Sequence, residues 1–293
     1  MPMPSFPVSL LTEQQIKPFI EGKTIIDIKC ETYYKGQYSW HGESLHNLSD
    51  VKNTKIIYAD SNFMVTDSGY ISYIIEFGYN NGDLRYFSSS SDIVIANITP
   101  SKKSTSDGYI LTFYLNDDSC ITLVLYGWST RLSIRENDMG NITIMPKSPI
   151  EVTDDNAFTL CSFKNWLSDR GSMNIVENCS TVKGAFDIYN PVMNYILLIS
   201  NIHPRTKTHN LSDDEIEKLY HNIKNTVDDY RLGKRVCEYI NIFGNTSAPK
   251  NDVVWLTSQM LGKPCPVCGE AIDFTPCAGT KMYFCPNCQK IKK

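Results

Sequence analysis

The sequence predicts a multidomain α/β (α+β) protein with a β-sandwich-like N-terminal domain, a helical middle domain and a C-terminal zinc ribbon. Three observations support this prediction. Runs rich in β-branched and aromatic residues fill the first half, apolar residues recur at helical spacing in the second half, and two Cys-x-x-Cys pairs stand near the end. A chain of 293 residues can divide into several domains. We expect these domains at 1–150, 151–250 and 251–293.

The N-terminal domain is expected to consist mostly of short strands. Turn-forming segments rich in Asn, Asp, Gly and Ser separate the strand-like runs, a pattern typical of a β-sandwich or barrel. A short helix is expected before the sheet, at 11–20, with Thr12 as its N-cap and Pro18 limiting its length. The expected strands are 24–30, 55–59, 70–78, 109–115 and 120–127.

The helical domain follows a proline-containing linker expected at 145–155. Ser212 and Glu215 form a capping-box pattern at the start of one helix. Before it, Asn190 is a candidate N-cap and Pro191 suits the first position of another helix. The sequence therefore predicts two helices joined by a turn. The apolar face of the later helix is Ile216, Leu219, Tyr220, Ile223 and Val227.

The C-terminal cysteines have the spacing of a metal site. Cys265 and Cys268 form one knuckle, Cys285 and Cys288 form the second, and sixteen residues separate the two. Four thiolates suit the tetrahedral geometry of Zn²⁺ and leave no open coordination position, so we expect one structural zinc ion. Cys277 falls between the knuckles and is interpreted as a spare thiol. The remaining cysteines are expected to be buried apolar residues: Cys30, Cys120, Cys161, Cys179 and Cys237.

Charge and hydropathy limit the partners and the location. The net charge is −4, but residues 1–182 carry a balance of −7 and residues 183–293 a balance of +3. A nucleic-acid contact is therefore expected in the C-terminal part, where phosphates meet more cations. The apolar run 195–199 is far shorter than a membrane span, and no leader pattern is recognisable at the N-terminus. Ten cysteines without a leader indicate reduced thiols, so we expect a cytoplasmic protein without membrane contact.

Three motifs in order resemble one protein family. A proline directly follows Met1, the helical segment reads "NPVMNYILLISNIHP…LSDDEIEKLYHNIK", and the end reads "GKPCPVCG…YFCPNCQK". This combination is similar to the formamidopyrimidine-DNA glycosylase / endonuclease VIII family, most clearly over 183–293 and more weakly at 37–48, as a divergent bacterial member. The resemblance implies a helix–two-turn–helix domain and a DNA repair enzyme that excises damaged bases and cuts the resulting abasic site.

The resemblance also implies that an N-terminal proline is the nucleophile. An α-amino group has a pKa of about 8, so roughly a tenth is neutral and reactive at pH 7. Pro2 takes this role if Met1 is removed, and Pro4 takes it if the mature chain starts at Met3. In the first case Met3 stands where the family has its catalytic Glu, and in the second case Ser5 does. Both alignments therefore lack the carboxylate that assists proton transfer.

Two residues are candidate DNA contacts by the same resemblance. Asn190 is retained, although Asp187 and Tyr189 stand where the family has glycines that let the backbone approach a phosphate. Thr280 stands where the family has a phosphate-binding Arg, and the adjacent Lys281 is the candidate replacement. The lysine that the family carries in its β-domain has no counterpart that we assign.

Three functions remain open at this level. The first is a base-excision DNA glycosylase and abasic-site lyase that acts, as a monomer, on double-stranded DNA with damaged bases or abasic sites. The second is a catalytically degenerate relative that binds such DNA without cutting it. The third is a protein-docking module built on the zinc ribbon. Trapping with borohydride distinguishes the first function from the others, and salt-dependent DNA binding distinguishes the second from the third.

Overall fold

The computed structural model describes residues 6–32, 48–60, 63–78, 84–93, 108–126, 131–137, 152–179, 188–237, 239–247 and 256–292. Pro2 and Pro4 lie outside these residues. The chain divides into two compact units. Unit 1 comprises Met1–Pro4, Val8–Ile144 and Glu238–Ala248, and unit 2 comprises Ser5–Pro7, Met145–Cys237 and Pro249–Lys293. The mixed α/β content is as predicted, and the three domain boundaries stay predictions.

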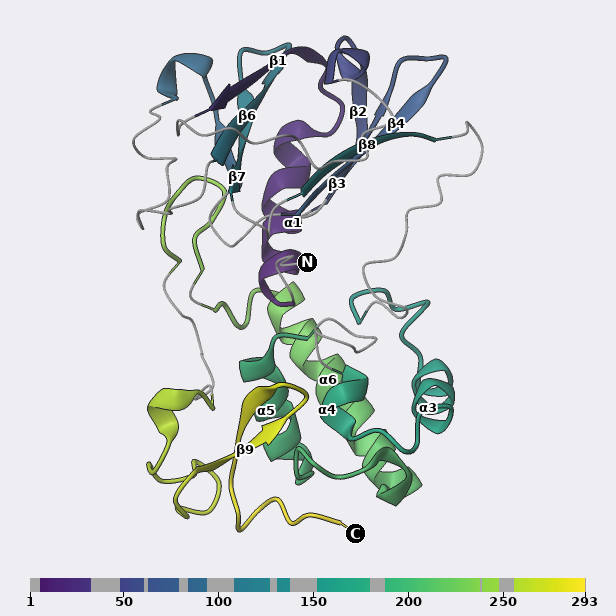
Figure 1. Cartoon of the computed structure of the whole chain (residues 1–293), viewed down its shortest axis with the longest axis vertical. Helices are drawn as coiled ribbons and strands as arrows, with labels where there is room; N and C mark the ends of the chain where they lie inside the picture. Colours follow the sequence, from purple (N-terminus) through teal and green to yellow (C-terminus); the bar gives the residue numbers. More distant parts are fainter. Residues whose placement is uncertain are drawn as a thin grey trace. The chain divides into compact units, whose positions relative to one another are not determined.

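Among its described residues, unit 1 contains two four-stranded antiparallel sheets and one α-helix (Figure 1). The first sheet has the order β1-β6-β7-β5, with bounds Ile25–Thr32, Gly108–Leu115, Cys120–Tyr126 and Leu84–Phe87. The second has the order β2-β3-β4-β8, with bounds Lys55–Ala59, Phe63–Asp67, Ser72–Gly78 and Arg131–Asn137. Helix α1, Val8–Ile20, lies beside the sheets.

The core of unit 1 draws on both sheets and on α1. Ile20 of α1, Ile56 of β2 and Leu111 of β6 are fully buried in one cluster. Ile242 joins the same cluster, and its carbonyl oxygen accepts a hydrogen bond of 2.8 Å from the backbone N–H of Tyr86 in β5. The segment 239–247 therefore adds to a core whose strands all come from the first half of the chain.

Several predictions about unit 1 are confirmed and others are wrong. All five expected strands exist, but β3, β5 and β8 were missed because they are short or carry few consecutive apolar residues. Helix α1 begins at Val8, so Thr12 is a buried interior residue and not the N-cap. Pro18 lies inside the helix near its end, where only one backbone hydrogen bond is lost. Of the scattered cysteines, Cys30 of unit 1 and Cys161 of unit 2 are exposed, contrary to expectation.

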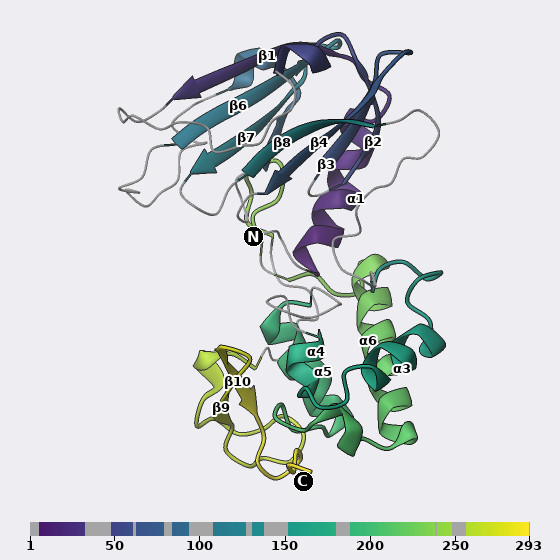
Figure 2. The ribbon, with the colours of Figure 1, turned by 45° about the vertical axis from the view of Figure 1, so that its right-hand side comes forward.

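Unit 2 contains four helices and a β-hairpin among its described residues (Figure 2). The helices are α3 Leu160–Ser168, α4 Ile175–Cys179, α5 Asn190–Ser200 and α6 Asp213–Arg231. The hairpin strands are β9 Asp273–Cys277 and β10 Thr280–Phe284. Short 3₁₀ turns complete the two units at Leu48–Val51, Ser90–Asp92, Thr208–Asn210 and Ser258–Met260. Within the described ranges, no helix has the length and apolar character needed to cross a membrane.

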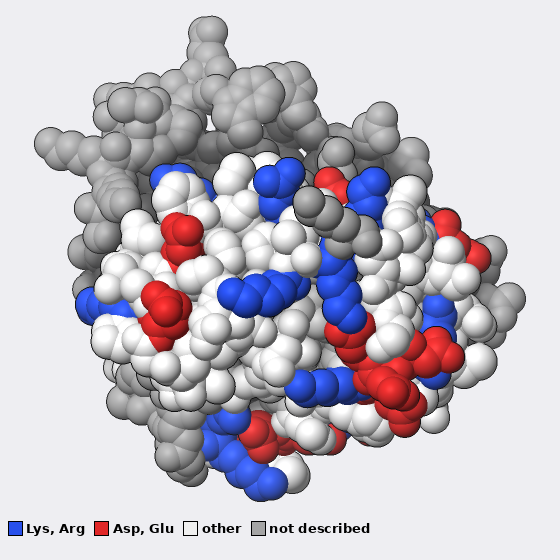
Figure 3. Space-filling view, turned by 90° about the horizontal axis from the view of Figure 1, so that it is seen from below, with Lys and Arg blue, Asp and Glu red and all other residues white. Residues whose placement is uncertain are grey.

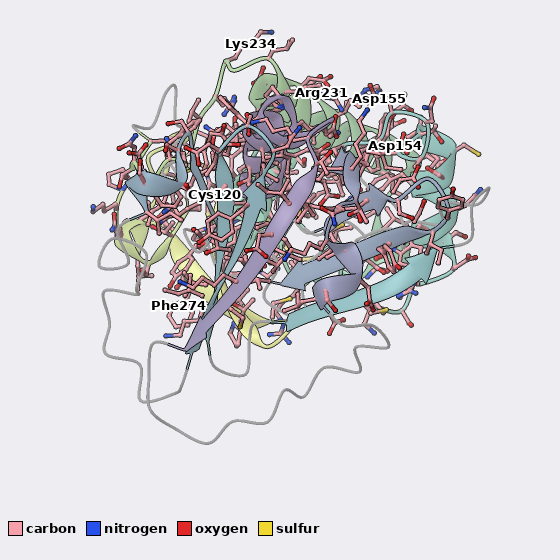
Figure 4. The ribbon with its side chains drawn as sticks, turned by 90° about the horizontal axis from the view of Figure 1, so that it is seen from above. Cys120, Asp154, Asp155, Arg231, Lys234 and Phe274 are labelled. Atoms are coloured by element: carbon pink, nitrogen blue, oxygen red, sulfur yellow. The ribbon has the colours of Figure 1, made fainter. Side chains whose placement is uncertain are left out.

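Side-chain contacts stabilise helix α6 at its start and in its C-terminal half. The predicted capping box is present: Ser212 Oγ accepts from the Glu215 N–H at 3.3 Å, and Glu215 Oε2 accepts from the Ser212 N–H at 2.9 Å. Near the other end, Asp155 pairs with Lys224 and, at 3.4 Å, with Arg231 (Figure 4). The hydrogen bond from Lys224 lowers the pKa of Asp155. These contacts attach the last residue of the predicted linker to α6.

Candidate functional site

The four predicted cysteines come together in unit 2. The Sγ atoms of Cys265, Cys268, Cys285 and Cys288 all lie within 4.8 Å of one another, and those of Cys268 and Cys285 are 3.4 Å apart. A zinc ion bound at about 2.3 Å to each sulfur places neighbouring sulfurs about 3.8 Å apart. The cluster therefore fits a tetrahedral Zn²⁺ site.

Backbone geometry holds each knuckle in place. The N–H of Val267 points at Cys265 Sγ, and the N–H of Cys288 points at Cys285 Sγ, both at 3.4 Å. Gly269 closes the first knuckle with φ +80°, a left-handed conformation that glycine adopts without strain. Such N–H groups stabilise thiolates, which are the form that binds a metal.

The thiols of the cage differ in acidity. A backbone N–H at Glu270 and neighbouring polar groups lower the pKa of the exposed Cys268 to about 6. Burial raises the pKa of Cys285. Cys268 is therefore the first of the pair to ionise at neutral pH, and a bound cation would drive ionisation of the other ligands.

Gln289 joins the cage to the segment after helix α5. This side chain is 1% exposed, and its Oε1 accepts from the Cys285 N–H at 2.8 Å. Its Nε2 donates to the Ile202 carbonyl oxygen, also at 2.8 Å. Leu198 of α5 packs in the same apolar cluster as Cys265 and Cys285. The metal site and α5 therefore share one core.

A tight turn connects the hairpin strands. Ala278 and Gly279 both have positive φ, 52° and 76°, as a two-residue hairpin turn of type I′ requires. Cys277, just before this turn, is 7% exposed, and its Sγ lies 3.3 Å from Asn174 Oδ1 and 3.5 Å from the Pro204 carbonyl oxygen. Burial raises its pKa to about 11, so it stays a thiol and can donate. Cys277 is a structural donor and not simply a spare thiol.

Helix α5 begins one residue earlier than predicted, at the residue that was expected to cap it. Tyr189 holds the N-cap position without a side-chain cap, and Asn190 is the first helical residue. Asn190 Nδ2 instead donates to Thr280 Oγ1 of β10 at 3.4 Å. Its Oδ1 atom is buried and accepts no hydrogen bond from the part of the chain that is described. Asn190 is thus a residue of the helix–hairpin junction and not the helix cap.

The described start of the chain reaches the same place. Phe6 is 2% exposed, forms a parallel bridge with Ile188, and accepts a hydrogen bond of 3.1 Å from the Tyr189 N–H at its carbonyl oxygen. Its ring packs edge-on against Tyr230 of α6 at 5.4 Å. The N-terminal segment, the start of α5 and the hairpin therefore converge around Asn190 within unit 2.

Lys281 lies on the other side of the hairpin strand. Adjacent side chains of a strand point to opposite faces. Thr280 therefore shares its face with the buried Met282, while Lys281 is exposed and lies 4.8 Å from the ring centre of Phe274. Asn190 and Thr280 are brought together, and Lys281 is not part of that pair.

Comparison with known proteins gives one consistent result. A stretch of 143 residues, 47% of this chain, is 31% identical to the formamidopyrimidine-DNA glycosylase of Oceanobacillus iheyensis and covers 49% of it. The corresponding protein of Bacillus subtilis is 31% identical over 146 residues, 47% of this chain and 50% of that protein. The chain spans about half the length of the curated relatives it matches. No protein-family model matches the chain.

Solved structures extend the likeness to the whole fold. The MutM (Fpg) protein of Thermus thermophilus matches with a TM-score of 0.67 at 17% identity, over 99% of this chain and 100% of that one. The predicted resemblance to the formamidopyrimidine-DNA glycosylase family is confirmed. The Lactococcus lactis Fpg in complex with DNA containing an abasic site has the same TM-score at 18% identity, over 98% of this chain and 100% of that one. The Fpg fold thus includes the N-terminal half, where sequence motifs are weak.

Sequence reasoning missed two residues of this site. Gln289 directly follows the last ligand cysteine. It could have been found from the sequence because the buried N–H groups of a knuckle need hydrogen-bond acceptors. Phe6 follows the N-terminal prolines, and its burial against Tyr230 has no local sequence signature because its partner lies more than two hundred residues away.

Proposed function

We propose that this chain is a base-excision DNA glycosylase with abasic-site lyase activity. Its partner is double-stranded DNA that contains damaged bases or abasic sites. One observation supports this most directly: the segment that follows the N-terminal prolines pairs with Ile188 and Tyr189, next to Asn190, which bonds to Thr280 of the hairpin. In this arrangement the N-terminus, α5 and the cysteine-bearing hairpin serve one site.

The chemistry begins with the secondary amine of an N-terminal proline, Pro2 or Pro4. Its nitrogen lone pair attacks C1′ of a nucleotide flipped from the duplex, and the bond to the damaged base breaks. The C1′–O4′ bond then breaks, O4′ takes up the proton that the nitrogen loses, and the sugar ring opens to give an iminium. The iminium withdraws electrons from the sugar, so a proton is lost from C2′ and the bond to the 3′ phosphate breaks. Hydrolysis of the iminium returns the free proline. The lack of a carboxylate at Met3 or Ser5 leaves proton transfer to another group or to water.

DNA contacts are assigned to two residues of unit 2. Asn190 lies at the start of α5 and can donate to a phosphate with an amide hydrogen. Lys281 is exposed on the opposite face of β10 and supplies a positive charge for a second phosphate. Both residues lie in the C-terminal part, whose charge balance is positive.

One zinc ion, held by Cys265, Cys268, Cys285 and Cys288, is assigned a structural role. It would stabilise the ribbon that carries Thr280 and Lys281, and it would leave the chemistry to the proline. In keeping with the resemblance, α5 and α6 form the helix–two-turn–helix element and the hairpin forms the zinc ribbon. We further propose a monomer in the cytoplasm, where cysteine ligands remain reduced.

The test joins intact-protein mass to covalent trapping. Natively expressed protein is incubated with abasic-site DNA and sodium borohydride, which reduces an iminium to a stable amine. We expect a mass that begins at Pro2 or Pro4 and a trapped protein–DNA species. Replacing the terminal proline by glycine lowers the yield of that species, because a secondary amine becomes a primary one, whereas the same change at the other proline leaves it intact.

Two results would contradict the proposal. A mature chain in which both prolines follow another residue has only amide nitrogens at these positions and cannot form the iminium. Binding to abasic-site DNA without any trapped species would instead assign the chain to the non-cutting alternative.

A further inference from the structure

Tyr189 presents an aromatic ring directly beside Asn190. Half of the residue's surface is exposed, 50%, although its backbone is well anchored. Its N–H donates to the Phe6 carbonyl oxygen at 3.1 Å, and its own carbonyl oxygen accepts from the N–H groups of Val192 at 2.9 Å and Met193 at 3.0 Å. Tyr189 is therefore held in place by its backbone at the start of α5 and leaves half of its surface exposed.

The polar groups next to this ring are neutral. Asn190 and Thr280 bond to each other at 3.4 Å, and neither carries a charge. Lys281 directly follows Thr280 in the sequence. It faces the opposite side of β10 and lies over Phe274. Figure 3 shows basic and acidic side chains interspersed on the face it presents, among the residues described there. The pair itself supplies no cation that would release counterions from a phosphate.

An exposed aromatic ring provides binding of another kind. A nucleobase that is not stacked in a duplex can stack on a tyrosine ring, and removal of such a ring weakens binding about 5- to 150-fold per base. Stacking neutralises no phosphate, so it adds nothing to the salt dependence of affinity. A tyrosine side chain at this position also keeps the backbone from approaching a phosphate as closely as a glycine allows.

We propose that Tyr189 is a base-stacking residue. Together with the neutral Asn190–Thr280 pair, it selects DNA that contains an unstacked nucleotide. This inference rests on the proposed DNA-binding function and narrows its substrate class. DNA with a gap, an abasic site or a flipped base offers the ring a free nucleobase, whereas intact duplex does not.

The experiment compares three variants of the full-length, zinc-loaded protein. Tyr189→Leu removes the ring and keeps an apolar side chain, and Tyr189→Phe keeps the ring and removes the hydroxyl. Tyr70→Leu is the matched control, because Tyr70 is 90% exposed in the turn between β3 and β4 of unit 1. Affinities are measured by fluorescence anisotropy for a short duplex with a single-nucleotide gap and for the same duplex without the gap.

We expect Tyr189→Leu to weaken binding to the gapped duplex about 5- to 150-fold and to change binding to the intact duplex less than about twofold. Tyr189→Phe and Tyr70→Leu should both match the parent protein within about twofold, since each keeps the ring at position 189. Equal affinities of the parent and Tyr189→Leu proteins for gapped DNA would overturn the inference and leave the proposed function standing. A parent protein that binds neither duplex would overturn both.

Discussion

The hydrogen bonds of Gln289 allow a quantitative prediction. Replacing Gln289 by Met keeps the length and volume of the side chain but removes its donor and its acceptor. The Cys285 N–H and the Ile202 carbonyl oxygen, each 2.8 Å from Gln289, then lose their partners in a site that is 1% exposed. Each orphaned buried group costs about 1–3 kcal/mol, so Gln289→Met should destabilise unit 2 by about 2–6 kcal/mol.

The assay is urea unfolding of the zinc-loaded protein, with zinc release followed by a colorimetric chelator. The variant should release zinc at a lower urea concentration, because the N–H of a ligand cysteine has lost its acceptor. Hydrogen exchange at the Cys285 amide should accelerate, which locates the effect. Gln259→Met is the matched control, since Gln259 is exposed in a 3₁₀ turn of the same unit. If Gln289→Met changes the free energy of unfolding by less than about 0.5 kcal/mol, the assignment of Gln289 as the link between the cage and α5 is refuted.

The remaining predictions concern charge, pH and capping. Thr280→Arg should add one phosphate contact, steepening the slope of log affinity against log salt by about 0.9, whereas Thr280→Ser should leave that slope unchanged. Burial lowers the pKa of His203, so the unfolded chain binds its proton first as pH falls below about 6.5. Stability attributable to His203 should therefore be complete above that pH and decline below it. His203→Asn, which can still accept the 3.1 Å hydrogen bond from the Arg205 N–H, should remove this decline in melting temperature between pH 7.5 and about 5.5; an unchanged decline would contradict the assignment. Ser212→Ala should cost about 1 kcal/mol by removing the cap of α6, and an unaltered urea midpoint would show that the capping box contributes nothing.

Local signals in the sequence were sufficient for much of the secondary structure. The runs predicted at 55–59 and 120–127 yielded β2 and, over Cys120–Tyr126, β7, because β-branched residues favour extended backbone wherever one face is buried. Ser212 and Glu215 marked the start of α6 because a capping box involves only neighbouring residues. The strand β8 was missed, because "RLSIREN" becomes a strand only by pairing with β4.

The residues of the candidate site also form two groups: those that local sequence signals indicate and those that only the fold reveals. The four zinc-ligand candidates could be identified without a structure, because each knuckle is a local turn and the spacing of its cysteines indicates metal binding. Three contacts became known only from the folded chain. Asn190 bonds to Thr280 and does not cap α5, Gln289 bonds to Ile202, and Phe6 packs against Tyr230. These contacts join residues that are far apart along the chain. Their partners are selected by the packing of the whole unit, which no short stretch of sequence encodes.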